Sequence, residues 1–303
     1  MKWADTSVVV TGASRGIGRA VALAMARRGA RVGAIARTGQ DLEDLRREEA
    51  GGGHMVVAEA DVSVRSEVEA ALASLRRQLG AIDVLVNNAG IGLYGAVAQL
   101  DPDDAERLVH VNYLGTVYPT LAVLPEMIER RRGAIVNVGS IAGRIGAPFE
   151  AAYSASKFAV VGFTEALALE VAPLGVRVSM VNPGPVDTGF FAARGHPYAR
   201  RAPRPIPPDR VAAAVLAAVE RPRLERTLPR SLRLATLVRL AAPRFYQVAT
   251  TWVFRSELAA LAAAVTPGRG DATASAAHDT TRTGETRTGE IRTGETRPME
   301  EQR

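Results

Sequence analysis

Hydrophobic and polar positions follow two different periodicities along the first 182 residues. Short runs rich in β-branched residues occupy 7–11, 31–36, 54–60, 82–87, 134–139 and 176–182. Between these runs, apolar residues recur at helical spacing over Gly16–Arg28, Leu42–Glu49, Val64–Leu79, Ala105–Arg131 and Ala151–Ala172. Strands that alternate with longer amphipathic helices are typical of βαβ units. The sequence therefore predicts an α/β fold built on a doubly wound parallel sheet.

The regular alternation stops at Pro183. Residues 183–208 are rich in proline, glycine and arginine, and they include Phe190, Phe191 and Tyr198. A loop of this length inside a compact domain usually has a function, so we expect an active-site lid. A helical pattern returns over Val211–Glu220.

The C-terminal part differs in composition from the rest. Residues 223–266 carry leucines with arginines between them, and prolines at 222, 229 and 243 predict short helices. Residues 267–303 contain an Arg-Thr-Gly-Glu repeat and almost no apolar residues, which predicts disorder. We therefore expect a catalytic domain over 1–222, a basic helical extension over 223–266 and a disordered tail.

Charge and composition exclude several classes of protein. Of the net charge of +6, the segment 221–255 contributes eight arginines against Glu225 alone, which leaves the body of the chain near neutral and tells against nucleic-acid binding. The chain has no cysteine and four unclustered histidines, so we expect no metal site. No leader-like N-terminus and no run of about 18 apolar residues is found, which favours a cytoplasmic protein.

A glycine-rich turn lies between the first predicted strand and helix, at Thr11–Gly18. Gly12 suits a tight turn, Gly16 lets the backbone approach a pyrophosphate, and Gly18 allows close packing of helix on strand. This is the arrangement of a dinucleotide-binding Rossmann fold, although a tight βα turn without a ligand is the alternative.

The second predicted strand ends at Arg37, where the dinucleotide motif normally has an acidic residue for the ribose 2′-hydroxyl. Arg37 and Arg15 could instead pair with a 2′-phosphate. The sequence therefore favours NADP(H) over NAD(H) as the cofactor, with two solvated surface charges as the alternative.

A second group of polar residues has the composition of an acid–base site. Tyr153 and Lys157 are spaced to lie on one face of a helix, where the ammonium would favour the phenolate. Ser140 ends the fifth predicted strand and could polarise a substrate carbonyl. Asn112 lies within a long helix, which predicts a kink or a bound water there, or else a plain surface position.

Together these segments resemble a short-chain dehydrogenase/reductase of the simple, single-domain subtype. The matching segments are Thr11–Gly18, Asp61-Val62, Asn87–Gly90, Asn112, Ser140, Tyr153–Lys157 and Asn182–Thr188. The resemblance is firm over 6–189 and absent beyond about 220. It implies an enzyme that interconverts an alcohol and a ketone or aldehyde by hydride transfer.

The resemblance also implies roles for individual residues. Tyr153 would be the acid/base, Lys157 would hold the nicotinamide ribose and lower the tyrosine pKa, Ser140 would orient the substrate, and Asn112 would position a relay water. The implied cofactor contacts are Gly12, Ser14, Arg15, Gly16, Ile17, Gly18, Arg37, Asp61, Val62, Asn88, Ala89, Gly90, Tyr153, Lys157, Pro183, Gly184, Val186 and Thr188.

The C-terminal segment departs from this family. A seventh strand is expected soon after the last helix, and Leu224–Leu228 is only a weak candidate. The basic, leucine-rich segment suggests an apolar small-molecule substrate. We expect it to form a roof over the substrate or a subunit contact in a homo-oligomer. A peripheral membrane contact through 223–255 is the alternative. A nucleotide-sugar dehydratase or epimerase and a non-catalytic NADP(H) sensor remain alternatives for the whole chain.

Overall fold

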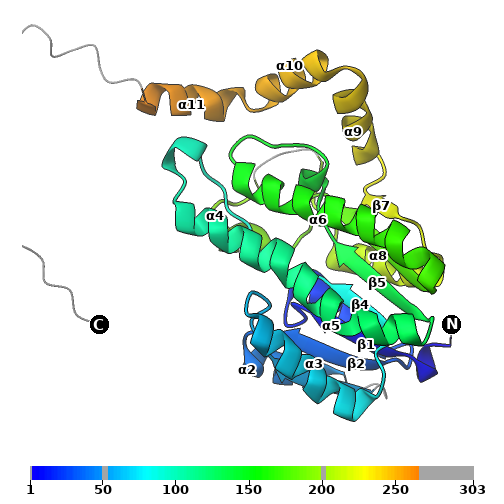
Figure 1. The fold of residues 1–303 in the computed structure, drawn as a ribbon. Helices are drawn as coiled ribbons and strands as arrows, with labels where there is room; N and C mark the ends of the chain where they lie inside the picture. The colour runs from blue at the N-terminus through cyan, green and yellow to red at the C-terminus, as the bar shows by residue number, and fades with distance from the viewer. Residues whose placement is uncertain (1, 50–53, 199–202, 266–303) are drawn as a thin grey trace, which may run out of the picture. The chain divides into compact units, whose positions relative to one another are not determined.

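The computed structural model describes residues 2–49, 54–198 and 203–265, which contain one parallel seven-stranded sheet (Figure 1). The strand order is β3-β2-β1-β4-β5-β6-β7. The strands are β1 (Ser7–Thr11), β2 (Arg31–Ala36), β3 (His54–Glu59), β4 (Val84–Asn87), β5 (Gly133–Val138), β6 (Val176–Pro183) and β7 (Glu225–Leu228). The order reverses between β1 and β4, and such a switch point opens a crevice at the carboxyl ends of the strands.

Helices cover both faces of the sheet. The helices of the described residues are α1 (Gly16–Ala26), α2 (Gly39–Glu48), α3 (Arg65–Leu79), α4 (Pro102–Leu108), α5 (Gly115–Glu129), α6 (Ala151–Val171), α7 (Phe190–Ala193), α8 (Pro208–Glu220), α9 (Leu232–Ala241), α10 (Pro243–Val253) and α11 (Arg255–Val265), of which α1, α2 and α8 pack on one face of the sheet and α3, α5 and α6 on the other. Single 3₁₀ turns form η1 (Trp3–Asp5), η2 (Val97–Gln99), η4 (Ile141–Gly143) and η5 (Ala172–Leu174), and η3 (Val109–Leu114) is a π-helical turn.

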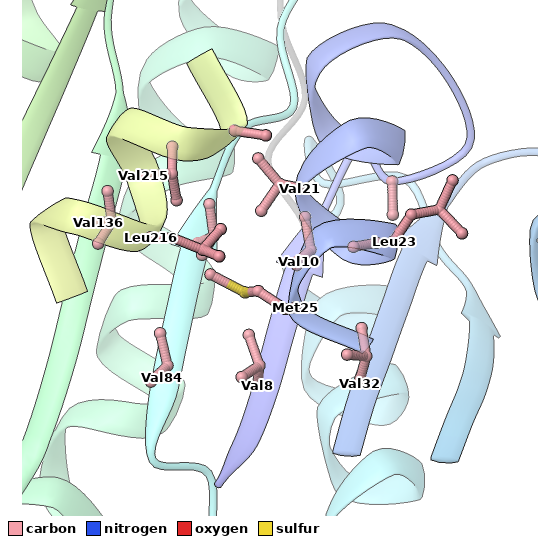
Figure 2. Packing of buried hydrophobic residues seen from close by; sticks show 14 of the residues in the cluster. Val8, Val10, Val21, Leu23, Met25, Val32, Val84, Val136, Val215 and Leu216 are labelled. Atoms are coloured by element: carbon pink, nitrogen blue, oxygen red, sulfur yellow. The ribbon is translucent and has the colours of Figure 1, made fainter. Parts of the chain in front are cut away.

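Alternate residues of the central strands point into two separate cores. In β1, Val8 and Val10 pack with α1, α2 and α8, as Figure 2 shows for Met25 and Leu216. Val9 between them packs on the opposite face with α3, α5 and α6. A strand that is buried on both faces needs a continuous run of apolar residues, which the β1 sequence Ser-Val-Val-Val-Thr supplies.

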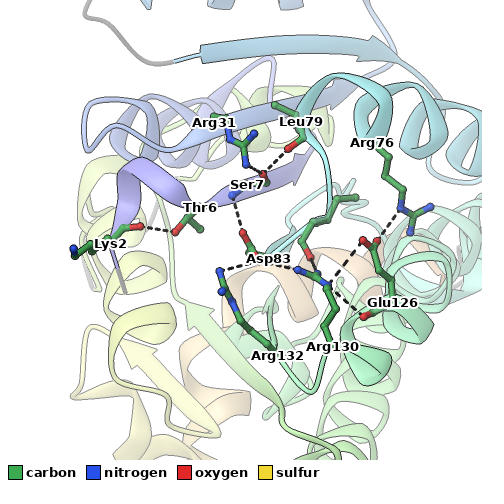
Figure 3. Close-up of polar contacts among 11 residues, drawn as sticks. Lys2, Thr6, Ser7, Arg31, Arg76, Leu79, Asp83, Glu126, Arg130 and Arg132 are labelled. Atoms are coloured by element: carbon green, nitrogen blue, oxygen red, sulfur yellow. Dashed lines mark hydrogen bonds and ion pairs between the residues drawn. The ribbon is translucent and has the colours of Figure 1, made fainter.

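A polar network joins the amino ends of the strands, at the edge of the sheet away from the crevice (Figure 3). The buried Asp83 accepts a hydrogen bond from the Ser7 amide at 3.1 Å and pairs with Arg130 at 3.0 Å and Arg132 at 3.2 Å. Arg31 donates to the Ser7 hydroxyl at 2.8 Å. One carboxylate therefore connects β1, β4 and the chain that enters β5.

The predicted α/β fold is confirmed, and the strand bounds agree to within two residues. The single helix predicted over Ala105–Arg131 is divided by the π turn η3 at Asn112, where the sequence indicated a kink. The weak strand candidate at Leu224–Leu228 forms β7, which pairs with β6. The predicted extension, which the structure describes as far as residue 265, contains short helices, as its prolines predicted.

The chain divides into two compact units, Met1–Leu258 and Ala259–Arg303. The second includes the end of α11 and residues 266–303. Residues 266–303 lie outside the described residues, and so does the tail predicted to be disordered over 267–303. The predicted domain boundary at residue 222 stays a prediction. None of the described helices is long and apolar enough to cross a membrane.

Candidate active site

A cavity of about 650 Å³ opens at the carboxyl ends of the parallel strands, at the switch point between β1 and β4. This volume lies within the range that small molecules and cofactors occupy in proteins. Its floor is built from the glycine turn after β1, the segment after β4 and the segment that connects the end of β6 to α7. The sheet topology therefore brings together segments that are far apart in the sequence.

The glycine turn leaves no room for a side chain at Gly12 or Gly18. Gly12 has φ +63°, and a Cβ there would lie 2.8 Å from the Ala89 Cα. A Cβ on Gly18 would lie 2.1 Å from the Gly12 oxygen. The Asn88 amide donates to the carbonyl oxygens of Thr11 at 3.0 Å and Gly12 at 3.1 Å, which holds the turn against the end of β4.

The amino end of α1 faces the cavity, because Arg15, Gly16 and Ile17 line it. No side chain caps this helix: Arg15, at the N-cap position, makes no capping hydrogen bond. Free backbone amides at a helix N-terminus, together with the helix dipole, favour a phosphate group. The cradle of Gly12 and Gly16 thus fits a dinucleotide pyrophosphate, as the sequence indicated.

Arg37 lies directly after β2, at the rim of the cavity. Its side chain is 50% exposed, and its guanidinium lies 3.9 Å from the Asp61 carboxylate. Arg15 is also exposed at this rim. Two guanidinium groups therefore flank the part of the cavity beside Asp61 and Val62, although Asp61 already offsets part of the charge of Arg37.

Tyr153 lies in the first turn of α6, and its side chain is buried against Phe190, with 5.8 Å between the ring centroids. The Tyr153 hydroxyl hydrogen bonds to the Ser140 side chain. Burial raises the pKa of Tyr153 to about 12, although Ser140 and Arg194 act in the opposite direction. Tyr153 is therefore a protonated phenol at neutral pH in this structure, and the expected lowering of its pKa by Lys157 is absent.

Lys157 lies one helical turn after Tyr153 and is also buried. Its ammonium donates to the Val138 carbonyl oxygen at 3.4 Å. Burial lowers the pKa of Lys157 to about 8. Gly90 faces this ammonium, since a Cβ there would lie 3.4 Å from the lysine Nζ. The absence of a side chain at Gly90 keeps the cavity open in front of Lys157.

Asn112 lies in the π turn η3 and is completely buried. Its amide accepts from the Ile91 N–H at 2.8 Å and donates to the Ile91 carbonyl at 3.0 Å and to the Ser156 hydroxyl at 2.9 Å. Ser156 in turn donates to the Tyr153 carbonyl oxygen at 2.7 Å. Asn112 therefore ties the segment after β4 to the first turn of α6.

The predicted lid contributes an aromatic wall with a buried cation. Phe190, Phe191, Arg194 and Tyr198 line the cavity. The Arg194 side chain is only 5% exposed, pairs with Glu150 and lies over the Phe191 ring, 4.7 Å from its centroid. Nothing in the sequence points to Arg194 or Glu150, because one arginine in an arginine-rich loop carries no signal of burial.

The cavity wall includes almost all of the residues that the sequence singled out, among them Ser14, Ala89, Pro183, Gly184, Val186 and Thr188. Gly18 and Asn112 do not line it. Both lie behind the wall and hold it in place, Gly18 through helix packing and Asn112 through hydrogen bonds. Within the described residues, no group of three or more histidine, aspartate or glutamate side chains could hold a metal ion.

A family model described as short chain dehydrogenase matches residues 6–198. The 3-ketodihydrosphingosine reductase of Bacteroides thetaiotaomicron is 39% identical over 185 residues, which are 60% of this chain and 65% of that protein, so the chain spans less than two thirds of this relative.

Two solved structures share the fold. An alcohol dehydrogenase from the archaeon Thermococcus sibiricus, complexed with 5-hydroxy-NADP, has a TM-score of 0.68 and 29% identity, and the match covers 74% of this chain and 95% of that one. A short chain dehydrogenase/reductase from Burkholderia phymatum, in complex with NAD, has a TM-score of 0.74 and 25% identity, with 81% and 96% covered. The two neighbours hold different dinucleotides.

Proposed function

This chain belongs to the short chain dehydrogenase family, and from that premise we propose that it is an oxidoreductase that interconverts an alcohol and a ketone or aldehyde with NADP(H). The observation that carries the proposal is the Tyr153 hydroxyl, which is buried at the cavity and hydrogen bonded to Ser140, with the Lys157 ammonium one turn away. A protein that only binds a dinucleotide has no need of this proton donor.

The pKa values favour reduction of a carbonyl. With a pKa of about 12, Tyr153 holds its proton at neutral pH and can donate it to the oxygen of a carbonyl that is being reduced. Ser140 orients that oxygen through its hydroxyl, and Lys157 binds the ribose of the dinucleotide. When bound, the dinucleotide supplies the hydride. The protein contributes position and charge.

NADP(H) is proposed on the basis of two residues. Arg37 stands where an acidic residue would bind the 2′-hydroxyl of NAD, and Arg15 lies at the same rim. Because the solved neighbours hold either dinucleotide, their names do not decide the preference. Planar guanidinium groups bind phosphate in a bidentate manner, which supports a site for the 2′-phosphate.

An apolar substrate is proposed from the wall above Tyr153. Phe190 and Leu93 pack with Tyr153, and Phe191 adds a second ring at the lid. The name of the bacterial relative describes a reductase of a ketone on a long-chain lipid base, which agrees with such a wall. Arg194 and Glu150 are charged residues within this otherwise apolar part of the wall, and their opposite charges neutralise each other in an ion pair.

Turnover of a chemically diverse carbonyl panel with NADPH and NADH tests the proposal. Wild-type protein should consume NADPH with at least one apolar ketone. Tyr153→Phe should reduce turnover at least about a hundredfold while NADPH affinity, measured by fluorescence titration, stays nearly unchanged. Tyr118→Phe is the matched control, because Tyr118 on α5 packs in the core away from the cavity. NADPH binding without turnover of any carbonyl would instead favour the non-catalytic sensor.

The remaining proposals concern the whole chain. We propose that residues 1–222, completed by the strand β7, form the catalytic domain and that the protein is a cytoplasmic homo-oligomer. Light scattering of the full chain and of a 1–230 truncation, which keeps β7, would measure the number of subunits and show whether the C-terminal segment holds them together.

A further inference from the structure

We propose that α9 and α10 form a docking surface for a lipid bilayer that contains anionic lipids. The first observation is the distribution of exposed apolar side chains. Of the thirteen large hydrophobic residues that are exposed in the described part of the chain, seven lie between Leu234 and Val253. Exposed apolar groups concentrated on two adjacent helices indicate an interaction surface, whereas scattered ones do not.

The outward side of α9 is formed by leucines. Leu234, Leu237 and Leu240 are spaced three apart and are 64%, 60% and 69% exposed. The opposite side of the helix already contacts the protein: Arg239 donates to the Arg144 carbonyl oxygen at 3.1 Å and lies over the Phe158 ring. These leucines therefore face away from the side of the helix that is packed.

α10 repeats this arrangement with larger side chains. Phe245, Val248 and Trp252 are spaced three and four apart and are 65%, 69% and 66% exposed. On the other side of the helix, the Tyr246 hydroxyl donates to the Gly146 carbonyl oxygen at 3.2 Å. Phe254, directly after the helix, is buried and stacks on Phe149. The helix is thus held by one side and presents an apolar stripe on the other.

The charge around these stripes identifies the partner. Residues 226–256 contain six arginines and no acidic residue. Arg233 and Arg244 are exposed beside the leucine and aromatic stripes, and Arg255 lies over the Trp252 ring, 4.9 Å from its centroid. Arginine next to exposed leucine, phenylalanine and tryptophan suits the interface of an anionic bilayer, where the rings enter the headgroup region and the guanidinium groups bind phosphates.

The same charge disfavours a second copy of this chain as the occupant. A twofold contact would bring two surfaces of the same basic sequence together without carboxylates to neutralise them. The surface also begins beside the cavity, because Leu232, the first residue of α9, lines the cavity wall. Docking would therefore hold the cavity wall near the lipid. The docking itself does not depend on the proposed oxidoreductase activity.

Vesicle co-sedimentation of the full-length protein tests the proposal. Wild-type protein should bind phosphatidylcholine vesicles that contain phosphatidylserine at least about tenfold more tightly than pure phosphatidylcholine vesicles, and added salt should weaken this binding. Arg233→Glu combined with Arg244→Glu should abolish the preference for phosphatidylserine. Phe245→Ser combined with Trp252→Ser should lower binding to both kinds of vesicle.

Control variants distinguish docking through α9 and α10 from nonspecific hydrophobic binding and from misfolding. Leu121→Ser combined with Leu169→Ser removes two leucines that are exposed on α5 and α6 and should leave vesicle binding unchanged. Circular dichroism should show that every variant keeps the wild-type melting temperature within a few degrees. Because Trp3 and Trp252 are the two tryptophans, Trp3→Phe leaves Trp252 as the fluorophore, and its emission should shift to shorter wavelength on vesicles.

Three results would overturn the proposal. The first is wild-type binding that is absent or equal on neutral and anionic vesicles. The second is a Trp252 emission that does not change on vesicles. The third is a dimer in light scattering that Phe245→Ser with Trp252→Ser converts to a monomer, which would make a second copy the occupant.

Discussion

At the scale of single residues, one physical cause perturbs both titratable groups of the site. Burial raises the pKa of Tyr153 to about 12 and lowers the pKa of Lys157 to about 8, because the uncharged form of each is favoured away from water. The result is a tyrosine that keeps its proton and a lysine that can lose it near pH 8. A proton donor at neutral pH is what carbonyl reduction requires.

The lysine pKa predicts a pH dependence of stability in the protein without cofactor. Between the folded pKa of about 8 and the ordinary value of 10.5, the unfolded chain binds more protons than the folded protein. The free energy of unfolding therefore increases as the pH is raised through this window. Raising the pH from 7 to 9.5 should add about 2 kcal/mol to the free energy of unfolding of the wild type relative to Lys157→Met. Urea denaturation at both pH values measures this difference, and parallel pH profiles would contradict the burial of the ammonium.

Arg37 predicts the cofactor preference. Arg37→Asp places a carboxylate where the 2′-phosphate of NADP would lie and should change the ratio of kcat/KM for NADPH over NADH by at least about tenfold, toward NADH. Arg177→Asp is the control, because Arg177 is an exposed residue of β6 that does not line the cavity. A wild-type preference for NADH would show the assignment to be wrong.

At the scale of elements, the π turn η3 is a specific adaptation of a long helix. The wider turn places Asn112 where its amide can bind both backbone groups of Ile91 and the Ser156 hydroxyl. π turns often occur at functional sites because they redirect a side chain. Here the redirected amide joins two segments that contribute to the cavity wall, those around Ile91 and Tyr153.

Asn112→Ala should therefore affect both stability and catalysis. The substitution leaves the Ile91 N–H and carbonyl without their partners, at a cost of about 2 kcal/mol in the free energy of unfolding. We expect kcat to fall more than KM changes, because the Tyr153 turn loses its support while the substrate wall remains. Ser156→Ala keeps both hydrogen bonds to Ile91 and should therefore cost less stability, but it breaks the link from Asn112 through Ser156 to the Tyr153 carbonyl oxygen, so kcat should fall here too. A change in stability without loss of kcat would limit Asn112 to a structural role.

At the scale of the whole molecule, the two ends of the sheet have different tasks. The carboxyl ends of the strands carry the cavity, whose wall includes the glycine turn and the buried Tyr153 and Lys157. The amino ends carry the network of Asp83, Ser7 and Arg130 (Figure 3), and none of these three residues lines the cavity. Substitutions in the Asp83 network should therefore change the stability of the protein without changing the chemistry at the cavity.

Asp83→Ala tests this separation. It removes the acceptor of the Ser7 amide and the partner of Arg130 and Arg132, and it should lower the free energy of unfolding by about 2 kcal/mol. Asp83→Asn keeps an oxygen for the Ser7 amide and should lose less. Thermal unfolding measures both variants. kcat below the melting temperature should be unchanged in each, so a loss of kcat without a loss of stability would contradict the separation.

The sequence by itself determined the sheet, the glycine turn and the positions of Tyr153, Lys157 and Ser140. These features depend on local properties: apolar runs give buried strands, Gly12 and Gly18 meet steric demands of one turn, and a spacing of four residues places two side chains on one helical face. At Asn112 the sequence left a kink, a bound water or a surface position open, because an amide inside a helix needs a partner, and the structure has a π turn there.

Only the tertiary structure decided the properties that depend on neighbours far away in the sequence. The pKa of Tyr153 is raised rather than lowered because the fold buries its ring beside Phe190. Arg194 is buried because Glu150, 44 residues earlier in the chain, meets it at the cavity. The leucines of α9 face outward because Arg239 and the elements around it occupy the other side. Periodicity shows that a helix has an apolar side, whereas packing decides which side is turned toward the protein.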